Sequence, residues 1–153
     1  MATNAAKMLA NEPEENDDDE GEIEYGNSNQ VSTNKTAHEF FYVLMQTGVY
    51  AQILHRQTRS IAEHMALGEF YNELGDLVDT LIESYQGCYG LVMDYPLDAK
   101  MPPLSSPSAM LMGLSDYVKA KRKAVADESQ FQNQIDEIAT LIDSTLYKLK
   151  FLS

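Results

Sequence analysis

The strongest constraint on the fold is the stretch from residue 36 to residue 89, where apolar residues recur at helical spacing with one short polar interruption. Apolar positions that repeat every three to four residues predict an amphipathic helix, and no strand-like alternation of any length accompanies them. The stretch therefore predicts two helices, over residues 36–57 and 60–89, joined by a tight turn. The first helix presents one face made of Ala37, Phe40, Phe41, Leu44, Gly48, Ala51 and His55. The core stripe of the second helix is Leu67, Phe70, Tyr71, Leu74, Leu77, Val78, Leu81 and Tyr85.

Both helices are preceded by capping signals. Thr36 followed by Glu39, and Ser60 followed by Glu63, have the spacing of a capping box, in which the two side chains satisfy each other's free backbone N–H groups. The sequence therefore predicts that the helices start at these residues. The first helix is apolar on nearly every side, which is typical of a helix that packs both within a bundle and against another subunit.

Two more helices follow after a long connection. Residues 90–106 contain three prolines and predict an ordered connection that crosses the end of the bundle, with one short helical turn. Ser106 and Pro107 form a helix start, and apolar spacing continues the helix over 107–126. Asp127 with Gln130 opens the last helix, over 128–150. Four helices with one long connection predict an all-α, antiparallel four-helix bundle of the ferritin-like kind over residues 36–153.

The first 35 residues differ in character from the rest of the chain. They hold nine acidic side chains against Lys7 and Lys35, a large share of the formal net charge of −13. Without apolar periodicity they cannot bury enough surface to offset the entropy of ordering, so a disordered acidic tail is predicted over residues 1–35. Such a tail can solubilise the protein, dock on a basic partner surface or mimic nucleic acid.

Charge and composition also exclude several classes of protein. DNA binding is not expected, because it needs a basic stripe, and the one basic cluster (Lys119, Lys121, Arg122 and Lys123) fits a solvated helix end. No run of apolar residues is long enough to span a membrane. The single cysteine, Cys88, cannot form an intrachain disulfide and is interpreted as a small residue near a helix end, in a reducing cytosol.

Residues with ligand chemistry lie along one flank of the predicted helix 60–89. At about 100° per residue, His64, Gly68, Gly75, Asp79 and Glu83 share that flank. A glycine inside a helix costs about 1 kcal/mol relative to alanine, which the close approach of a neighbouring backbone would explain. The flank is therefore expected to face another helix.

The segment LHRQTRSIAEHMALGEFYNELGDLVDTLIESY resembles the Dps branch of the ferritin-like superfamily. That family has Leu-His near the end of its first helix, then His-x-x-x-Asp, then Asp-x-x-x-Glu; here His55, His64, Asp79 and Glu83 stand at the matching positions. Gly68 stands where the family has a bridging aspartate. The strings Leu54 to Tyr71, Leu77 to Gly90 and Leu146 to Leu152 are similar to uncharacterised tailed-phage proteins, which implies a phage origin.

The resemblance implies a divalent metal site between two subunits, with His55 and His64 from one chain and Asp79 and Glu83 from the other. Iron is the implied metal, with zinc or manganese as alternatives, and bound iron would be oxidised by peroxide or oxygen. The implied assembly is a homo-oligomer formed through the helices 36–57 and 60–89. The alternative is a non-catalytic phage structural or interaction protein that uses the bundle as a scaffold and the acidic tail for a viral or host partner. Either protein would reside in the bacterial cytoplasm or in the virion.

Overall fold

The computed structural model describes residues 34–101 and 105–152, and within them every regular element is a helix. There are four: α2 (Lys35–Gln57), α3 (Ile61–Tyr89), α4 (Pro107–Val125) and α5 (Ser129–Phe151). Each bound lies within one residue of the predicted range. None of these described helices combines the length and the apolar character that a membrane span needs. The all-α prediction is confirmed for this part of the chain.

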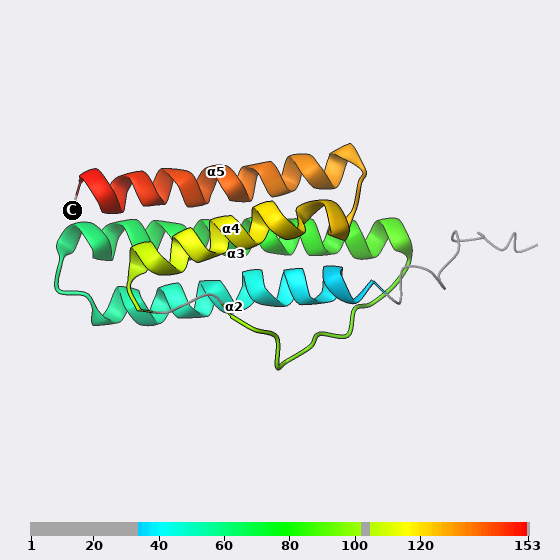
Figure 1. Cartoon of the computed structure of the whole chain (residues 1–153), viewed down its shortest axis with the longest axis horizontal. Coiled ribbons are helices and arrows are strands. Elements are labelled where there is room, and N and C mark those ends of the chain that lie inside the picture. Colours follow the sequence, from blue (N-terminus) through cyan, green and yellow to red (C-terminus); the bar gives the residue numbers. More distant parts are fainter. Residues whose placement is uncertain (1–33, 102–104, 153) are drawn as a thin grey trace, which may run out of the picture.

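The helices form a bundle in which each runs antiparallel to its two main neighbours (Figure 1). α2 packs against α3 and α4, and α5 packs against the same two helices from the other side. As a result, α3 and α4 lie at diagonally opposite corners of the bundle and run in the same direction, although they are consecutive in the chain. This arrangement explains the long connection, because the chain must return along the length of the bundle before α4 can begin.

The core of the bundle is built from the predicted apolar stripes of all four helices. Its largest fully buried side chains include Phe40, Phe41, Phe70, Tyr85 and Phe131. The Tyr85 ring joins three helices, since its centroid lies 5.1 Å from that of Phe41 on α2 and 5.5 Å from that of Phe131 on α5. Burying an aromatic or branched side chain of this size contributes about 1.5–3 kcal/mol, so these contacts are the main source of the stability of the bundle.

The start of α2 differs from the prediction. The N-cap is Asn34, whose side-chain oxygen accepts a hydrogen bond from the N–H of Ala37 at 3.1 Å, and Thr36 lies inside the helix. Asparagine is among the most favourable N-cap residues. Its amide nitrogen also donates to the carbonyl oxygen of Val125 at the end of α4, at 3.0 Å. The predicted capping box at Thr36 was therefore wrong. Asn34 and Lys35, which were assigned to the acidic tail, belong to the bundle. The rest of the predicted tail, residues 1–33, lies outside the described residues.

The predicted start of α3 is correct only in part. Ser60 is the N-cap, and its hydroxyl accepts from the N–H of Glu63 at 3.3 Å. The Glu63 carboxylate does not return to the Ser60 N–H but accepts from the hydroxyl of Thr58. Thr58 in turn accepts the Ser60 N–H at 3.1 Å. A third side chain thus completes the capping arrangement within the turn.

α5 starts one residue later than expected and without the predicted side-chain cap. Its N-cap is Glu128, which makes no capping hydrogen bond. The Glu128 carboxylate accepts instead from the hydroxyl of Tyr89 at 2.6 Å, across the end of the bundle. Burial raises the pKa of the Tyr89 phenol above its usual value, and the hydrogen bond to Glu128 raises it further. The prediction that Asp127 and Gln130 cap the start of α5 was wrong. The N-cap position is taken by Glu128, whose side chain is held by the contact with Tyr89.

The connection between α3 and α4 follows the side of the bundle and does not cross its end (Figure 1). Residues 91–101 pass along the outer side of α2, where the Tyr42 hydroxyl donates to the carbonyl oxygen of Leu97 at 2.8 Å. A turn closed by the N–H of Ala99 and the carbonyl of Pro96 replaces the expected helical turn. The predicted start of α4 is confirmed: the Ser106 hydroxyl accepts from the N–H of Ala109, and Pro107 is the first helical residue.

Candidate functional site

Two of the four predicted site residues, His55 and His64, form a stacked pair where α2 turns into α3. Their ring centroids are 3.8 Å apart and the ring planes differ by 23°. Nδ1 of His55 lies 2.8 Å from the carbonyl oxygen of His64, and Nδ1 of His64 lies 3.0 Å from the carbonyl oxygen of His55. Tyr71 meets the His55 ring edge-on, with the centroids 5.4 Å apart. The pair therefore locks the end of α2 to the first turn of α3.

These hydrogen bonds fix the tautomer of both neutral rings. A carbonyl oxygen only accepts, so each Nδ1 must carry the proton and donate it. The lone pair of each neutral ring is then on Nε2, the atom left for an outside ligand. His64 is exposed and His55 is half-buried. The pair thus offers imidazole nitrogen ligands of the kind that bind zinc, iron and related metals.

The stacked geometry limits how such an ion can bind. The lone pair of Nε2 lies in the plane of its ring, and a bound ion lies about 2.1 Å away near that plane. Two nearly parallel rings 3.8 Å apart cannot both direct their lone pairs at one ion. Each imidazole therefore fits a separate ion, or one of the two serves as a single ligand. The remaining ligands of either ion must come from elsewhere.

Gly68 explains why the histidine pair fits against α3. A Cβ atom at this position would lie 3.3 Å from Cε1 and 3.4 Å from Nδ1 of His55. The sequence predicted the close approach of a backbone at the glycines of this flank, but at Gly68 the neighbour is a side-chain ring. At Gly75 a Cβ would meet no described atom of the same chain within 4 Å. A backbone that approaches this glycine would have to come from a second chain, so at Gly75 the expectation stays a prediction.

Replacing Gly68 with alanine is expected to be unfavourable despite the higher helix propensity of alanine. The His55 ring cannot retreat without losing its hydrogen bond to His64 and its contact with Tyr71. Gly87 is the matched control, because it lies in the same helix with nothing within 4 Å of an added Cβ. Gly87→Ala should gain up to about 1 kcal/mol, and Gly68→Ala should be at least about 1 kcal/mol less stable than that control. Equal urea midpoints for the two variants would contradict this role of Gly68.

Asp79 and Glu83 lie on α3 far from the histidines of the same chain. Fifteen residues of helix separate His64 from Asp79, which is about 22 Å. The two carboxylates lie one turn apart on the same helix, as the sequence predicted, and both are exposed in the monomer. Among the described residues, no group of three or more histidine, cysteine, aspartate or glutamate side chains is arranged to hold a metal ion. A single protomer therefore does not bring the four predicted ligands together.

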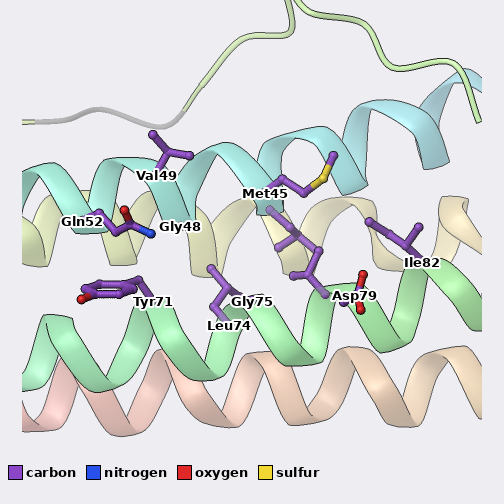
Figure 2. Close-up of a pocket in the computed structure, with 11 residues that line it drawn as sticks. Met45, Gly48, Val49, Gln52, Tyr71, Leu74, Gly75, Asp79 and Ile82 are labelled. Carbon is purple, nitrogen blue, oxygen red and sulfur yellow. The ribbon is translucent and has the colours of Figure 1, made fainter.

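A groove between α2 and α3 extends from Tyr71, which contacts His55, to Asp79 and Ile82. It has a volume of about 260 Å³ and is lined by Leu44, Met45, Gly48, Val49, Gln52, Tyr71, Leu74, Gly75, Val78, Asp79 and Ile82. Figure 2 shows that the lining side chains come from both helices and that most are apolar. The absence of side chains at Gly48 and Gly75 deepens the groove. Asp79 is the one charged residue among those that line it.

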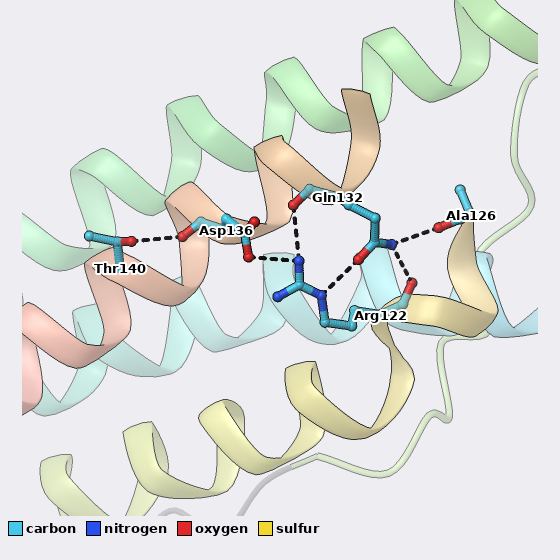
Figure 3. Close-up of polar contacts among 5 residues, drawn as sticks. All are labelled: Arg122, Ala126, Gln132, Asp136 and Thr140. Carbon is cyan, nitrogen blue, oxygen red and sulfur yellow. Dashed lines mark hydrogen bonds and ion pairs between the residues drawn. The ribbon is translucent and has the colours of Figure 1, made fainter. Parts of the chain in front are cut away.

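The predicted basic cluster is only partly a solvated helix end, because Arg122 is held in a network between α4 and α5 (Figure 3). Its guanidinium donates to the side-chain oxygen and the carbonyl oxygen of Gln132, at 2.8 and 3.1 Å. It also pairs with Asp136 at 2.7 Å. The Gln132 amide donates to the carbonyl oxygens of Arg122 and Ala126, at 3.1 and 2.6 Å. One glutamine thus holds the turn between the two helices from both sides.

Replacing Gln132 with alanine should destabilise the bundle by about 2–3 kcal/mol. The variant removes three side-chain hydrogen bonds and leaves half-buried carbonyl oxygens at the end of α4 without these donors. Chemical denaturation followed by circular dichroism measures the change. Gln130→Ala is the control, since Gln130 is exposed on the same helix and makes only a long contact to the sulfur of Cys88. A loss as large in the control as in Gln132→Ala would contradict the role of the network.

These features define a four-helix bundle with a locked histidine pair and an apolar groove on one face. The chain belongs to a family of unknown function (DUF5856), whose model matches residues 55–149. The matched range begins at His55 and contains all four predicted site residues. Neither the curated proteins nor the solved structures compared with the chain give a significant match.

Proposed function

We propose that this protein is a phage-encoded, ferritin-like bundle that pairs with a second copy through the face formed by α2 and α3, and that the pair binds a divalent metal. In this proposal His64, with His55 beside it, faces Asp79 and Glu83 of the other copy. The ferritin-like assignment draws on two antiparallel helix pairs joined by a connection that runs the length of the bundle.

The observation that carries the proposal is the position of the groove. Consider two copies related by a two-fold axis, with their α3 helices antiparallel. His64 of one copy lies opposite Asp79 or Glu83 of the other only if the axis crosses α3 halfway between His64 and that carboxylate in the sequence. Those midpoints fall between Tyr71 and Leu74. The groove is lined by Tyr71, Leu74 and Gly75 at this level. A hollow, apolar surface therefore lies where the two-fold axis of the proposed pair must pass.

The exposed surface beside the groove also favours a partner. Met45, Val49 and Ile53 follow one another at intervals of four residues along α2, so they form a continuous apolar stripe. Val49 and Ile53 are 48% and 46% exposed in the monomer. Covering such a stripe with the same stripe of a second copy would remove apolar area from water on both sides. A self-complementary surface is what a two-fold interface requires.

The donor set of the pair suits a divalent metal. Imidazole nitrogen and carboxylate oxygen together are suitable ligands for iron(II), zinc or manganese. One Nε2 from the stacked histidines with Asp79 and Glu83 of the other chain gives a mixed site that the stacked rings permit. Iron held there would be open to oxidation by oxygen or peroxide.

Metal analysis of untagged, full-length protein, combined with its mass in solution, tests the proposal. The expected result is a dimer or a larger even oligomer that retains iron or zinc in a fixed ratio to the chain. His64→Ala and Asp79→Ala should each lose the metal and keep their helical content. A monomer without metal would contradict both parts of the proposal, and a metal-free dimer would contradict the metal site alone.

The second candidate is a non-catalytic structural or interaction protein of a phage, located in the virion or the host cytoplasm. One observation favours it: both histidines already have a structural role, because each ring donates to the backbone of the other. In this case the pair is a lock for the helical turn. The candidate predicts that the wild-type protein binds no metal, the outcome that separates it from the metal-binding proposal.

A further inference from the structure

Two pockets follow one another along the groove between α3 and α5. The first, of about 230 Å³, is lined by Ala62, Met65, Ala66, Glu69, Lys148 and Leu152. The second, of about 390 Å³, lies further from the turn between α2 and α3, and its lining includes Glu73 and Glu137. The connection between α3 and α4 runs along α2, on another side of the bundle (Figure 1). We call this surface the α3–α5 groove.

The α3–α5 groove changes from apolar to acidic along its length. At its apolar end, Met65 and Leu152 are 56% and 60% exposed. In the second pocket, Glu73 and Glu137 are exposed, and neither takes part in an ion pair within residues 34–101 and 105–152. The third carboxylate of this pocket, that of Asp136, is already paired. A surface that fits the groove must therefore be apolar at one end and cationic at the other.

The outer side of α4 has this chemistry in the same order. Met112, Asp116, Lys119 and Lys123 are exposed and lie within about 60° of one another around the helix. Lys119 and Lys123 follow Met112 by about 10 and 16 Å of helix. Neither lysine is part of an ion pair in the described part of the chain. α4 therefore presents an exposed apolar side chain followed by two lysines that have no carboxylate partner among the described residues.

We propose that the α3–α5 groove of one copy receives the outer side of α4 of a second copy. Met112 would fill the pocket between Met65 and Leu152. Glu73 lies about 12 Å along α3 from Met65, and Lys119 lies about 10 Å along α4 from its own methionine. The lysine and the carboxylate are therefore level when the methionine is in place.

The other two charges on the outer side of α4 also meet opposite charges in this arrangement. Lys123 extends further into the second pocket, toward Glu137. Asp116 comes level with Lys148, whose side chain is 41% exposed even though it forms an ion pair within its own chain. Each charge of α4 thus has an opposite charge near it, in the right order along the groove. This order favours a second copy over a partner that is uniformly basic.

The contact joins two different surfaces, so each copy can offer α4 to one neighbour and its groove to another. Neighbouring copies run in the same direction, because α3 and α4 of one chain do (Figure 1). The contact uses neither the groove between α2 and α3 nor the histidine pair, so it is independent of the proposed metal-binding pair. Surface ion pairs are weak and screened by salt. The contact should therefore form at low salt and be lost at about 0.5 M salt.

Disulfide trapping in the full-length protein tests the contact directly. One chain carries Met112→Cys and the other Met65→Cys, both with Cys88→Ser. Mixed at low salt under mild oxidation, they should form mainly the disulfide between positions 112 and 65, which peptide mass spectrometry identifies. The control replaces the first chain by Lys121→Cys, also with Cys88→Ser, because Lys121 lies on the opposite side of α4, about 160° from Lys119. Its yield should be at least about tenfold lower, since a disulfide needs Cα atoms within about 7 Å. Equal yields, or mainly disulfides between identical positions, would overturn the proposal.

A charge swap tests the ionic part of the contact. One full-length variant carries Lys119→Glu and Lys123→Glu, and a second carries Glu73→Lys and Glu137→Lys. Analytical ultracentrifugation measures the association that is present at low salt and lost at high salt. Each variant alone should associate at least about tenfold more weakly than the wild type, because like charges meet at the contact. An equal mixture should recover the association, since α4 of either variant then meets the opposite charge in the groove of the other.

The control for the charge swap carries Lys35→Glu and Lys100→Glu. These lysines are exposed on α2 and on the connection, outside both surfaces, and the change in net charge is the same as in the first variant. The control should associate like the wild type. An equal loss in the control, no recovery in the mixture, or a wild type whose mass does not change with salt would each overturn the proposal.

Discussion

Refolding His64→Ala together with Asp79→Ala should restore metal binding that neither variant shows alone. If each site takes its imidazole from one chain and its carboxylates from the other, a mixed dimer contains one intact site. The second site of that dimer lacks both ligands. Random mixing gives half mixed dimers, so about a quarter of the wild-type metal content is expected. Zinc is a suitable probe, because it has no redox chemistry, and the bound zinc is measured after removal of free metal.

The control for this experiment mixes His64→Ala with a chain that carries both substitutions. No combination of those chains assembles an intact site, so the zinc content should stay at the background level. Circular dichroism must show that each variant keeps its helices, since His64 also helps to lock the turn between α2 and α3. Full zinc binding by wild type without recovery in the first mixture would contradict a site shared between subunits.

The apolar pattern predicted the helices well because the same side chains that define the period also form the core. Phe70, Leu74 and Leu81 repeat along one face of α3 and are at most 1% exposed. Ser106 and Pro107 likewise determine the start of α4 through local chemistry alone, a hydroxyl acceptor followed by a residue without an N–H. Where the determinants are neighbours in sequence, reasoning from the sequence succeeds.

The errors occurred where a residue distant in sequence determines the outcome. Asn34 caps α2 and also reaches the end of α4, about ninety residues away. Glu128 is drawn to Tyr89, 39 residues earlier. A local capping rule compares only adjacent side chains, so it cannot weigh such contacts. The path of the connection along α2 similarly depends on which helices share a diagonal, a property of the whole bundle.

The candidate site was predictable in composition and not in geometry. Helical spacing placed His55 on the inner face of α2 and His64 at the start of α3, so their proximity follows from a short turn. Their mutual hydrogen bonds depend on the conformation of Thr58 and Ser60 within the turn, which no residue pattern specifies. The helix cost of a glycine at position 68 is visible in the sequence, but its contact with the His55 ring depends on how α2 and α3 pack.

Gly75→Arg is expected to convert the proposed pair into monomers without harming the fold. A Cβ atom at this position would meet no described atom within 4 Å in the monomer, and arginine favours a helix more than glycine does. In the pair, however, two guanidinium groups would enter the apolar groove close to the two-fold axis. Burying like charges that lack partners is strongly unfavourable.

We expect the dissociation constant of the pair to rise at least about 100-fold, which corresponds to about 2.7 kcal/mol. Analytical ultracentrifugation across a range of concentrations measures this change, and thermal unfolding checks the fold. Thr80→Arg is the matched control, because it adds the same side chain at an exposed position about 140° around α3 from Gly75. The control should associate like the wild type. A Gly75→Arg protein that also associates normally would place the interface on another face of the bundle.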